Sequence, residues 1–503
     1  MASDIAKDYE QHDAPEWTSN ENHYHSKNPH LHSVYGPIKA EHSIDCLEVI
    51  EGEVPKDLTG VYIRNGSNPR FESKGPHHWF DGDGMIHALN IKDGKVSLKN
   101  KWVRTKHFNM ESEVQEAIWP GYANVRPDPE APKGGGSDFA IKDASNTDVI
   151  WYNGAVFSTF YQTGVPYRVN PVTLETEGQE TFNSKLPRQV SAHCKVDDAT
   201  GEIMFFDYNM EEPYMTYGVG DKNGNLTNFT EIPLPGPRLP HDMAITENYS
   251  ILMDLPLHWD DEQVKRGQYS LHFYKDKPSR FAVIPRHGSK EDIQWFDAKA
   301  CYMYHTVNAY EKDGKVIMDG CAQQDPLIPR QPGDNIIDRM EAASTWTDVR
   351  LYSWTFDLAT GETTEGFLDD TNVEFPMMNF DQYIGKEYRY IYATLMPKDD
   401  LISFNGIYKL DLQTKEKQVY EFPEGKCASE TPFSPADNAV EEDDGYLVCF
   451  LTDIETGESE ANIFDAKDIS KGPVCRLAVP YRVPAGFHSC WVNAEKLAST
   501  DAI

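Results

Sequence analysis

From Leu47 onward, apolar and polar residues alternate in short runs that are rich in Val, Ile, Tyr and Phe. Alternation with a period of two is typical of a β-strand with one buried face. Few windows show the spacing of an amphipathic helix. The pattern therefore predicts an all-β protein.

A recurring turn signal separates these runs. It begins with Asp or Asn and has Thr in its middle; the copies are residues 170–175 (NPVTLE), 198–202 (DATGE), 357–362 (DLATGE), 411–416 (DLQTKE) and 453–458 (DIETGE). The first side chain can accept backbone N–H bonds, and Gly, where present, supplies a positive φ. Further hairpin tips are expected at Asp93-Gly94, Asn153-Gly154, Asn223-Gly224 and Asp313-Gly314.

Many similar antiparallel hairpins are best buried by radial repetition, which leaves few open sheet edges. We therefore predict a β-propeller and assign residues 47–503 to a single catalytic domain with cap insertions. Residues 1–46 are polar and His-rich without hydrophobic periodicity, so we expect a solvated, loosely packed N-terminal arm without chemistry of its own. The irregular stretch at residues 111–145 is too long for a hairpin loop and is typical of a functional lid.

The charge balance excludes several classes of function. A formal net charge of -34 argues against nucleic-acid binding and leaves at most weak contact with an anionic membrane. The sequence has neither a signal-peptide pattern at its start nor an apolar run long enough for a spanning helix, so we expect a cytoplasmic protein. The eight cysteines form no CxxC pair, which favours reduced, structural thiols.

Four of the seventeen histidines lie at or beside strand-like segments and next to small or aromatic residues: His193, His241, His305 and His488. A single histidine in such a position is more often an ordinary core or surface residue than a metal ligand. In a propeller, however, the inner strands converge on one axis, so histidines far apart in sequence can meet there. Four neutral imidazoles suit iron, copper or zinc, and they leave octahedral positions open.

Several separated motifs, in the same order along the chain, resemble the carotenoid cleavage oxygenase family. They are residues 60–69 (GVYIRNGSNP), 80–87 (FDGDGMIH), 146–149 (NTDV), 191–195 (SAHCK), 239–248 (LPHDMAITEN), 304–308 (YHTVN) and 486–491 (GFHSCW). This family includes carotenoid and apocarotenoid dioxygenases, lignostilbene dioxygenases and the retinal isomerohydrolase. The resemblance implies a seven-bladed β-propeller with a helical and loop cap, and Fe(II) held on the axis by the four histidines.

The resemblance also implies roles for other residues. Three glutamates of the family orient the metal-bound imidazoles; Glu374 and Glu430 match two of them, whereas Gln162 occupies the third place and adds no negative charge. Thr147 matches a threonine that lines a vacant iron position. The residues expected to line the substrate site are Tyr122, Tyr161, Phe80, Phe108 and Phe487, and Tyr161 stands where stilbene-cleaving relatives have a lysine.

The implied reaction is cleavage of a carbon–carbon double bond by O2 to give two carbonyl products. We favour an apocarotenoid or another apolar conjugated alkene as substrate, with a stilbene or phenylpropanoid alkene as the alternative. Isomerohydrolase chemistry on a retinyl ester and a propeller that serves only as a binding scaffold also remain open. No Ser/His/Asp triad, nucleophile elbow or phosphate-binding glycine loop is evident in the sequence.

Overall fold

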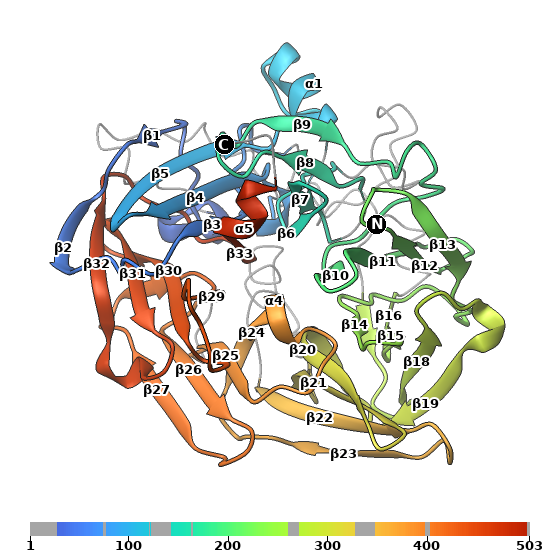
Figure 1. Ribbon diagram of the computed structural model, residues 1–503. Coiled ribbons are helices and arrows are strands. Elements are labelled where there is room, and N and C mark those ends of the chain that lie inside the picture. Colours follow the sequence, from blue (N-terminus) through green and yellow to red (C-terminus); the bar gives the residue numbers. More distant parts are fainter. Residues whose placement is uncertain are drawn as a thin grey trace, which may run out of the picture.

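The computed structural model of the 503-residue chain describes residues 28–73, 77–119, 121, 142–161, 164–259, 271–326, 348–397 and 403–499. Seven antiparallel sheets surround a central axis, each as one blade (Figure 1). The predicted all-β class and seven-bladed propeller are therefore confirmed.

The blades follow the chain in order around the axis. From the axis outward, blade 1 contains β33 (Ser489–Asn493), β3 (Gly60–Arg64), β4 (Met85–Lys92), β5 (Lys95–Trp102) and β1 (Ser43–Ile44). Blade 2 contains β6 (Asp148–Tyr152), β7 (Ala155–Thr159), β8 (Tyr167–Val169) and β9 (Thr176–Gln179). Blade 3 contains β10 (Lys195–Asp197), β11 (Glu202–Tyr208), β12 (Met215–Gly220) and β13 (Leu226–Glu231).

Blade 4 contains β14 (Ala244–Ile245), β15 (Tyr249–Asp254), β18 (Ser279–Pro285) and β19 (Gln294–Ala298), with the hairpin of β16 (Leu257–Trp259) and β17 (Leu271–Phe273) inserted. Blade 5 contains β20 (Tyr302–Lys312), β21 (Lys315–Gln323), β22 (Val349–Asp357) and β23 (Thr363–Phe367). Blade 6 contains β24 (Val373–Met377), β25 (Tyr390–Leu395), β26 (Gly406–Asp411) and β27 (Lys417–Glu421). In blade 7, β28 (Lys426–Ala428) and β29 (Phe433–Pro435) both pair with β30 (Gly445–Asp453), followed by β31 (Ser459–Asp465), β32 (Pro473–Val479) and β2 (Glu48–Gly52).

Helices are short in the described part of the chain. The α-helices are α1 (Lys106–Val114), α4 (Phe380–Tyr383) and α5 (Ala494–Ala498), and the 3-10 helices are η1 (Pro29–Leu31), η2 (Ser33–Tyr35), η3 (Trp79–Asp81), η5 (Lys290–Asp292) and η6 (Ile469–Lys471). None of the described helices is long and apolar enough to cross a membrane. The cytoplasmic location stays a prediction.

Strands from the two ends of the described chain close the ring. The C-terminal strand β33 pairs with β3 from Gly60↔Asn493 to Arg64↔Ser489, and the N-terminal strand β2 pairs with β32 (Figure 1). Shared sheets of this kind satisfy the backbone groups that an open blade edge would expose. The closure also fixes the position of His488, which directly precedes β33.

The predicted hairpin tips lie at turns between paired strands. At residues 357–362, the Asp357 carboxylate accepts two following backbone N–H groups, both at 3.0 Å, and Gly361 has φ 76°. The same side-chain arrangement occurs at Asn170, Asp411 and Asp453. At residues 198–202 the accepting carboxylate belongs instead to Asp197, one residue earlier. All eight cysteines are free thiols, as expected.

The described part of the N-terminal arm packs against the propeller. Tyr35 is 4% exposed, and its ring lies 4.9 Å from that of Trp79. Arg482 donates a hydrogen bond to the carbonyl oxygen of Gly36 at 2.6 Å. The expectation of loose packing is therefore wrong for residues 28–38, where apolar side chains among the polar ones insert into the core, whereas residues 39–46 are exposed or half-buried. The domain boundary at residue 46 stays a prediction, and residues 1–27, 120 and 122–141 lie outside the described residues.

Candidate metal centre

The four predicted histidine ligands come from the axial ends of four blades. His193 lies two residues before β10, and His241 lies three residues before β14. His305 lies within β20, and His488 directly precedes β33. These strands are the innermost of their blades, so the propeller brings together residues that are distant in sequence (Figure 1).

The four imidazole rings form one buried cluster. The ring centroid of His193 lies 4.8 Å from that of His241 and 5.0 Å from that of His305. The centroid of His488 lies 4.6 Å from those of both His193 and His305. The Nε2 atoms of His193 and His241 are 3.2 Å apart. Neighbouring nitrogen ligands of one octahedral metal, each about 2.1 Å from it, are separated by about 3 Å, so this spacing fits a shared ion.

Their surroundings keep three of these imidazoles neutral. Burial, followed by neighbouring imidazoles, lowers the pKa of His193, His241 and His305 well below the usual histidine value. Burial opposes charge on His488 too, but Glu430 outweighs it and raises the pKa of that imidazole. Nε2 of His305 is buried and has no hydrogen-bond partner among the described residues. A buried neutral nitrogen without a donor is a natural metal ligand.

Two buried carboxylates face the outer nitrogens of the cluster. Glu374 Oε2 lies 2.7 Å from Nδ1 of His305, and Glu430 Oε1 lies 3.0 Å from Nδ1 of His488. The second oxygen of Glu430 also accepts the Ser489 hydroxyl at 2.9 Å. A carboxylate at Nδ1 fixes the tautomer that leaves Nε2 free for a metal. The geometry thus supports the expected roles of both glutamates.

Comparisons with known proteins agree with this geometry. The family model described as retinal pigment epithelial membrane protein matches residues 35–493. A carotenoid 9,10(9',10')-cleavage dioxygenase from Arabidopsis thaliana is 32% identical over 497 residues, which cover 93% of this chain and 90% of the relative. The chain belongs to the carotenoid cleavage oxygenase family.

Solved structures of this family share the fold over most of the chain. A lignostilbene dioxygenase from Pseudomonas brassicacearum superimposes with a TM-score of 0.80 at 28% identity, covering 93% of this chain and 99% of that one. A cobalt-substituted apocarotenoid oxygenase from Synechocystis gives a TM-score of 0.78 at 26% identity, covering 90% and 96%. In this carotenoid cleavage oxygenase, His193, His241 and His305 are buried and close enough together to bind one metal ion.

Four of the expected open-site and substrate residues lie close to the histidines. The Tyr161 ring lies 5.6 Å from His241 and 5.1 Å from the ring of Phe80. The Thr147 hydroxyl accepts the Tyr161 backbone N–H at 3.2 Å, and the Thr147 carbonyl accepts that of His488 at 3.2 Å. Phe487 precedes His488, and its ring lies 5.4 Å from Phe80.

The remaining expected residues are not brought to the cluster by the described contacts. Phe108, in α1, packs against Trp102 at 6.0 Å and forms part of the core between blades 1 and 7. Gln162 and Tyr122 lie outside the described residues. Nδ1 of His241 is buried and has no hydrogen-bond partner within the described part of the chain. The roles assigned to Phe108, Gln162 and Tyr122 stay predictions.

The structure adds aromatic residues that sequence reasoning missed. The ring of Phe375 stacks on His488 at 4.5 Å and lies 5.0 Å from His305. The ring of Tyr304 lies 4.9 Å from His241. Phe375 directly follows Glu374, and Tyr304 is the first residue of the motif at 304–308, so their position next to an identified residue was the available signal. Together they give the cluster apolar walls.

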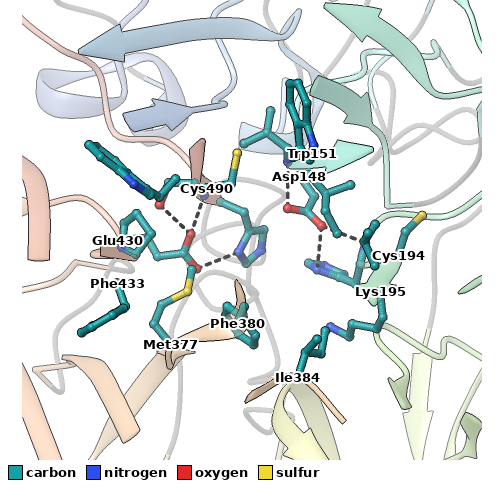
Figure 2. A pocket seen from close by; sticks show the side chains of 18 of the residues that line it. Asp148, Trp151, Cys194, Lys195, Met377, Phe380, Ile384, Glu430, Phe433 and Cys490 are labelled. Atoms are coloured by element: carbon teal, nitrogen blue, oxygen red, sulfur yellow. Dashed lines mark hydrogen bonds and ion pairs between the residues drawn. The ribbon is translucent and has the colours of Figure 1, made fainter. Parts of the chain in front are cut away.

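A cavity of about 970 Å³, open solvent included, adjoins the histidines along the propeller axis. Its walls come from the inner strands and from α4 and α5, with Lys195, Met377, Cys490 and Lys496 among the lining residues. Figure 2 shows Glu430 on one side of this cavity and Asp148 on the other. Asp148, which follows Thr147, was not singled out from the sequence.

A second, narrow pocket lies beside a buried lysine and encloses about 320 Å³ of non-atom space, open solvent included. Its lining residues are Phe71, Ser73, Phe80, Asp81, Glu111, Trp119, Lys142 and Phe160. Nζ of Lys142 lies 2.6 Å from carboxylate oxygens of both Asp83 and Glu111, and its side chain is 10% exposed. Burial alone would lower the pKa of Lys142, but the two carboxylates outweigh it and raise that pKa above its usual value. Phe80 connects this charged cavity to Tyr161 and the histidines.

Proposed function

We propose that this protein is a non-haem Fe(II) dioxygenase that cleaves one C=C bond of an apocarotenoid or a related conjugated alkene. The observation that carries the proposal is the convergence of buried imidazoles on the axis: His193, His241 and His305 place ligand nitrogens within 4.8 Å of one another, and the ring of His488 lies 4.6 Å from those of His193 and His305. All-nitrogen ligation from four histidines suits a divalent transition metal and leaves two octahedral positions for O2 and solvent. A scaffold protein without turnover has no use for such a cluster.

The reaction balances without further reactants. The alkene R–CH=CH–R′ and one O2 give R–CHO and R′–CHO, so both oxygen atoms enter the products. When bound, Fe(II) would bind O2 and activate it by one-electron transfer, because O2 does not react directly with a singlet alkene. The protein contributes position and environment, because no proton has to be removed from the alkene.

The residues of this chain have separate tasks in that reaction. His193, His241, His305 and His488 hold the metal, and Glu374 and Glu430 orient two of them. Thr147, Tyr161 and Phe487 restrict the space beside the metal. Phe80 and Phe375 add apolar surface that excludes water and aligns a flat conjugated chain.

The Lys142 cavity supports a substrate whose apolar chain ends in a hydroxyl group. The ammonium faces two carboxylates, which leaves a local excess of negative charge and disfavours a carboxylate or phosphate end. A hydroxyl can accept a hydrogen bond from Lys142 and donate one to a carboxylate oxygen. The narrow pocket has room for a hydroxyl group, and its aromatic side chains Phe71, Trp119 and Phe160 would lie beside the end of the substrate that bears this hydroxyl.

A phenolic stilbene or phenylpropanoid is the second candidate, because its phenolic hydroxyl could make the same hydrogen bonds to Lys142 and a carboxylate. The two candidates differ in length and number of conjugated double bonds.

A panel of hydroxylated and deoxy apocarotenals, hydroxystilbenes and vinylphenols, assayed for aldehyde products under 18O2, distinguishes them. We expect the highest kcat/KM for a hydroxylated apocarotenal and one 18O atom in each product. Absence of 18O in any product, with an iron-loaded protein, would reject dioxygenase chemistry and favour isomerohydrolase chemistry.

A further inference from the structure

Asp148 joins blade 2 to the histidine cluster. It is the first residue of β6, and it lines the axial cavity on the side opposite Glu430 (Figure 2). Its Oδ2 accepts the backbone N–H of His193 at 3.1 Å and lies 3.5 Å from Nδ1 of the same residue. One carboxylate oxygen therefore faces both the main chain and the imidazole of one histidine.

The backbone of His193 needs such a partner. Its φ is 64°, in the left-handed region, where the Cβ of a residue other than glycine is crowded. Unfavourable backbone conformations persist at functional sites only where surrounding contacts hold them. The hydrogen bond from His193 N–H to Asp148 is such a contact, and it fixes the direction in which the imidazole leaves the chain.

The Asp148 carboxylate is itself held in place. Its other oxygen, Oδ1, accepts the backbone N–H of Val149 at 2.7 Å. The side chain is 13% exposed, compared with 5% for His193, so the contact is largely shielded from solvent. Because one oxygen of this carboxylate is fixed by the main chain, the other can hold the histidine in one orientation and does not move with it.

The outer nitrogens of the other three histidines have different partners from that of His193. Glu374 faces His305, and Glu430 faces His488, whereas Nδ1 of His241 has no hydrogen-bond partner among the residues that the structure describes. Asp148 is thus a third carboxylate that faces Nδ1 of a cluster histidine, and that histidine differs from the two that the glutamates face.

We propose that Asp148 is the positioning residue of His193: it holds the left-handed backbone of that residue and directs its Nε2 toward the metal. The inference rests on the proposed function, because it requires a metal at the four histidines. Asp148 touches neither substrate nor O2 in this role and acts only through His193.

The test compares Asp148→Ala and Asp148→Asn with the unchanged protein and with Asp198→Ala. Asp198 lines the same cavity but pairs with Lys496 at 2.7 Å and not with a histidine, so its removal is a matched control. Each metal-free protein is loaded with Fe(II) anaerobically. Affinity is measured by competition with a chelator, the ligand field by the EPR spectrum of the Fe(II)–NO adduct, and folding by thermal unfolding of the metal-free form.

We expect about 10- to 100-fold weaker Fe(II) binding for Asp148→Ala, with an altered EPR spectrum. Asp148→Asn should lose less affinity, because its amide oxygen still accepts the His193 N–H, and Asp198→Ala should match the unchanged protein. An Asp148→Ala protein that binds Fe(II) as tightly as the unchanged one, with the same spectrum, would overturn the inference alone. Failure of the unchanged protein to bind Fe(II) would overturn the proposed function instead.

Discussion

The carboxylate of Glu374, in β24, lies 2.7 Å from Nδ1 of His305, in the neighbouring inner strand β20, and its side chain is fully buried. Burial of an unpaired carboxylate would cost several kcal/mol. A hydrogen bond donated by Nδ1 of His305 offsets this cost. Donation from Nδ1 leaves the His305 Nε2 lone pair free, and that atom has no other partner among the described residues.

Replacement of Glu374 by Gln should weaken Fe(II) binding by about 10- to 100-fold, because the amide keeps an acceptor but loses the charge that makes His305 a stronger ligand. Chelator competition on the anaerobic protein measures this. Glu362→Gln, in the exposed turn after β22, provides the control and should bind Fe(II) like the unchanged protein. Equal Fe(II) affinity for all three proteins would show that Glu374 does not contribute to metal binding.

Lys142→Met should destabilise the protein by about 3–5 kcal/mol, since it leaves the buried carboxylates of Asp83 and Glu111 without a cation. Urea unfolding at neutral pH measures the change. Lys417→Met removes an exposed lysine that pairs with Asp369 and should cost less than about 1 kcal/mol. A similar small effect for both variants would mean that water already solvates the Lys142 cluster.

The double variant Lys142→Gln/Glu111→Gln tests substrate recognition while it keeps the local net charge unchanged. We expect KM to rise about tenfold for a hydroxylated substrate, equivalent to about 1.4 kcal/mol, with little change in kcat. KM for the deoxy counterpart should stay constant. An equal rise for both substrates would indicate a loss of cavity shape rather than of hydroxyl recognition.

His107 should make the protein less stable in mild acid. Burial, followed by Lys142, lowers the pKa of His107 to about 4 from an ordinary value of 6.5. Between these two values the unfolded chain binds a proton that the folded chain does not, so stability falls as the pH falls through this window. His107→Asn retains an acceptor for the Asp143 N–H, which His107 Nδ1 accepts at 2.7 Å.

Unfolding experiments on both proteins between pH 6.5 and 4.5 isolate this contribution. Relative to His107→Asn, the unchanged protein should lose roughly 2 kcal/mol over that range. Parallel stability curves would show that His107 takes up a proton equally well in both states.

Much of the fold was readable from the sequence because its turns are marked locally. Strand reversals are predicted by the Asp–Gly and Asn–Gly pairs and by the Asp-x-x-Thr-Gly segments. Because a propeller is built mainly from repeated hairpins, these turns were enough to indicate the architecture. Ring closure by β2 and β33 depends on partners more than 400 positions away, and no local pattern indicates it.

The metal site was predictable only in part, for similar reasons. The four histidines and two glutamates were found through family motifs. Asp148 and Lys142 were missed because their importance arises from partners in other elements, His193 for one and Asp83 with Glu111 for the other. The left-handed backbone of His193 could not be predicted from its residue type. The packing of residues 28–38 was missed because this segment is largely polar.

The most direct test of the central claim is a crystal structure of the protein loaded anaerobically with Fe(II), with anomalous diffraction recorded at the iron edge. The account predicts one strong peak on the propeller axis, about 2.2 Å from Nε2 of His193, His241, His305 and His488. A peak at any other position, or one that fewer than four of these nitrogens approach, would contradict it.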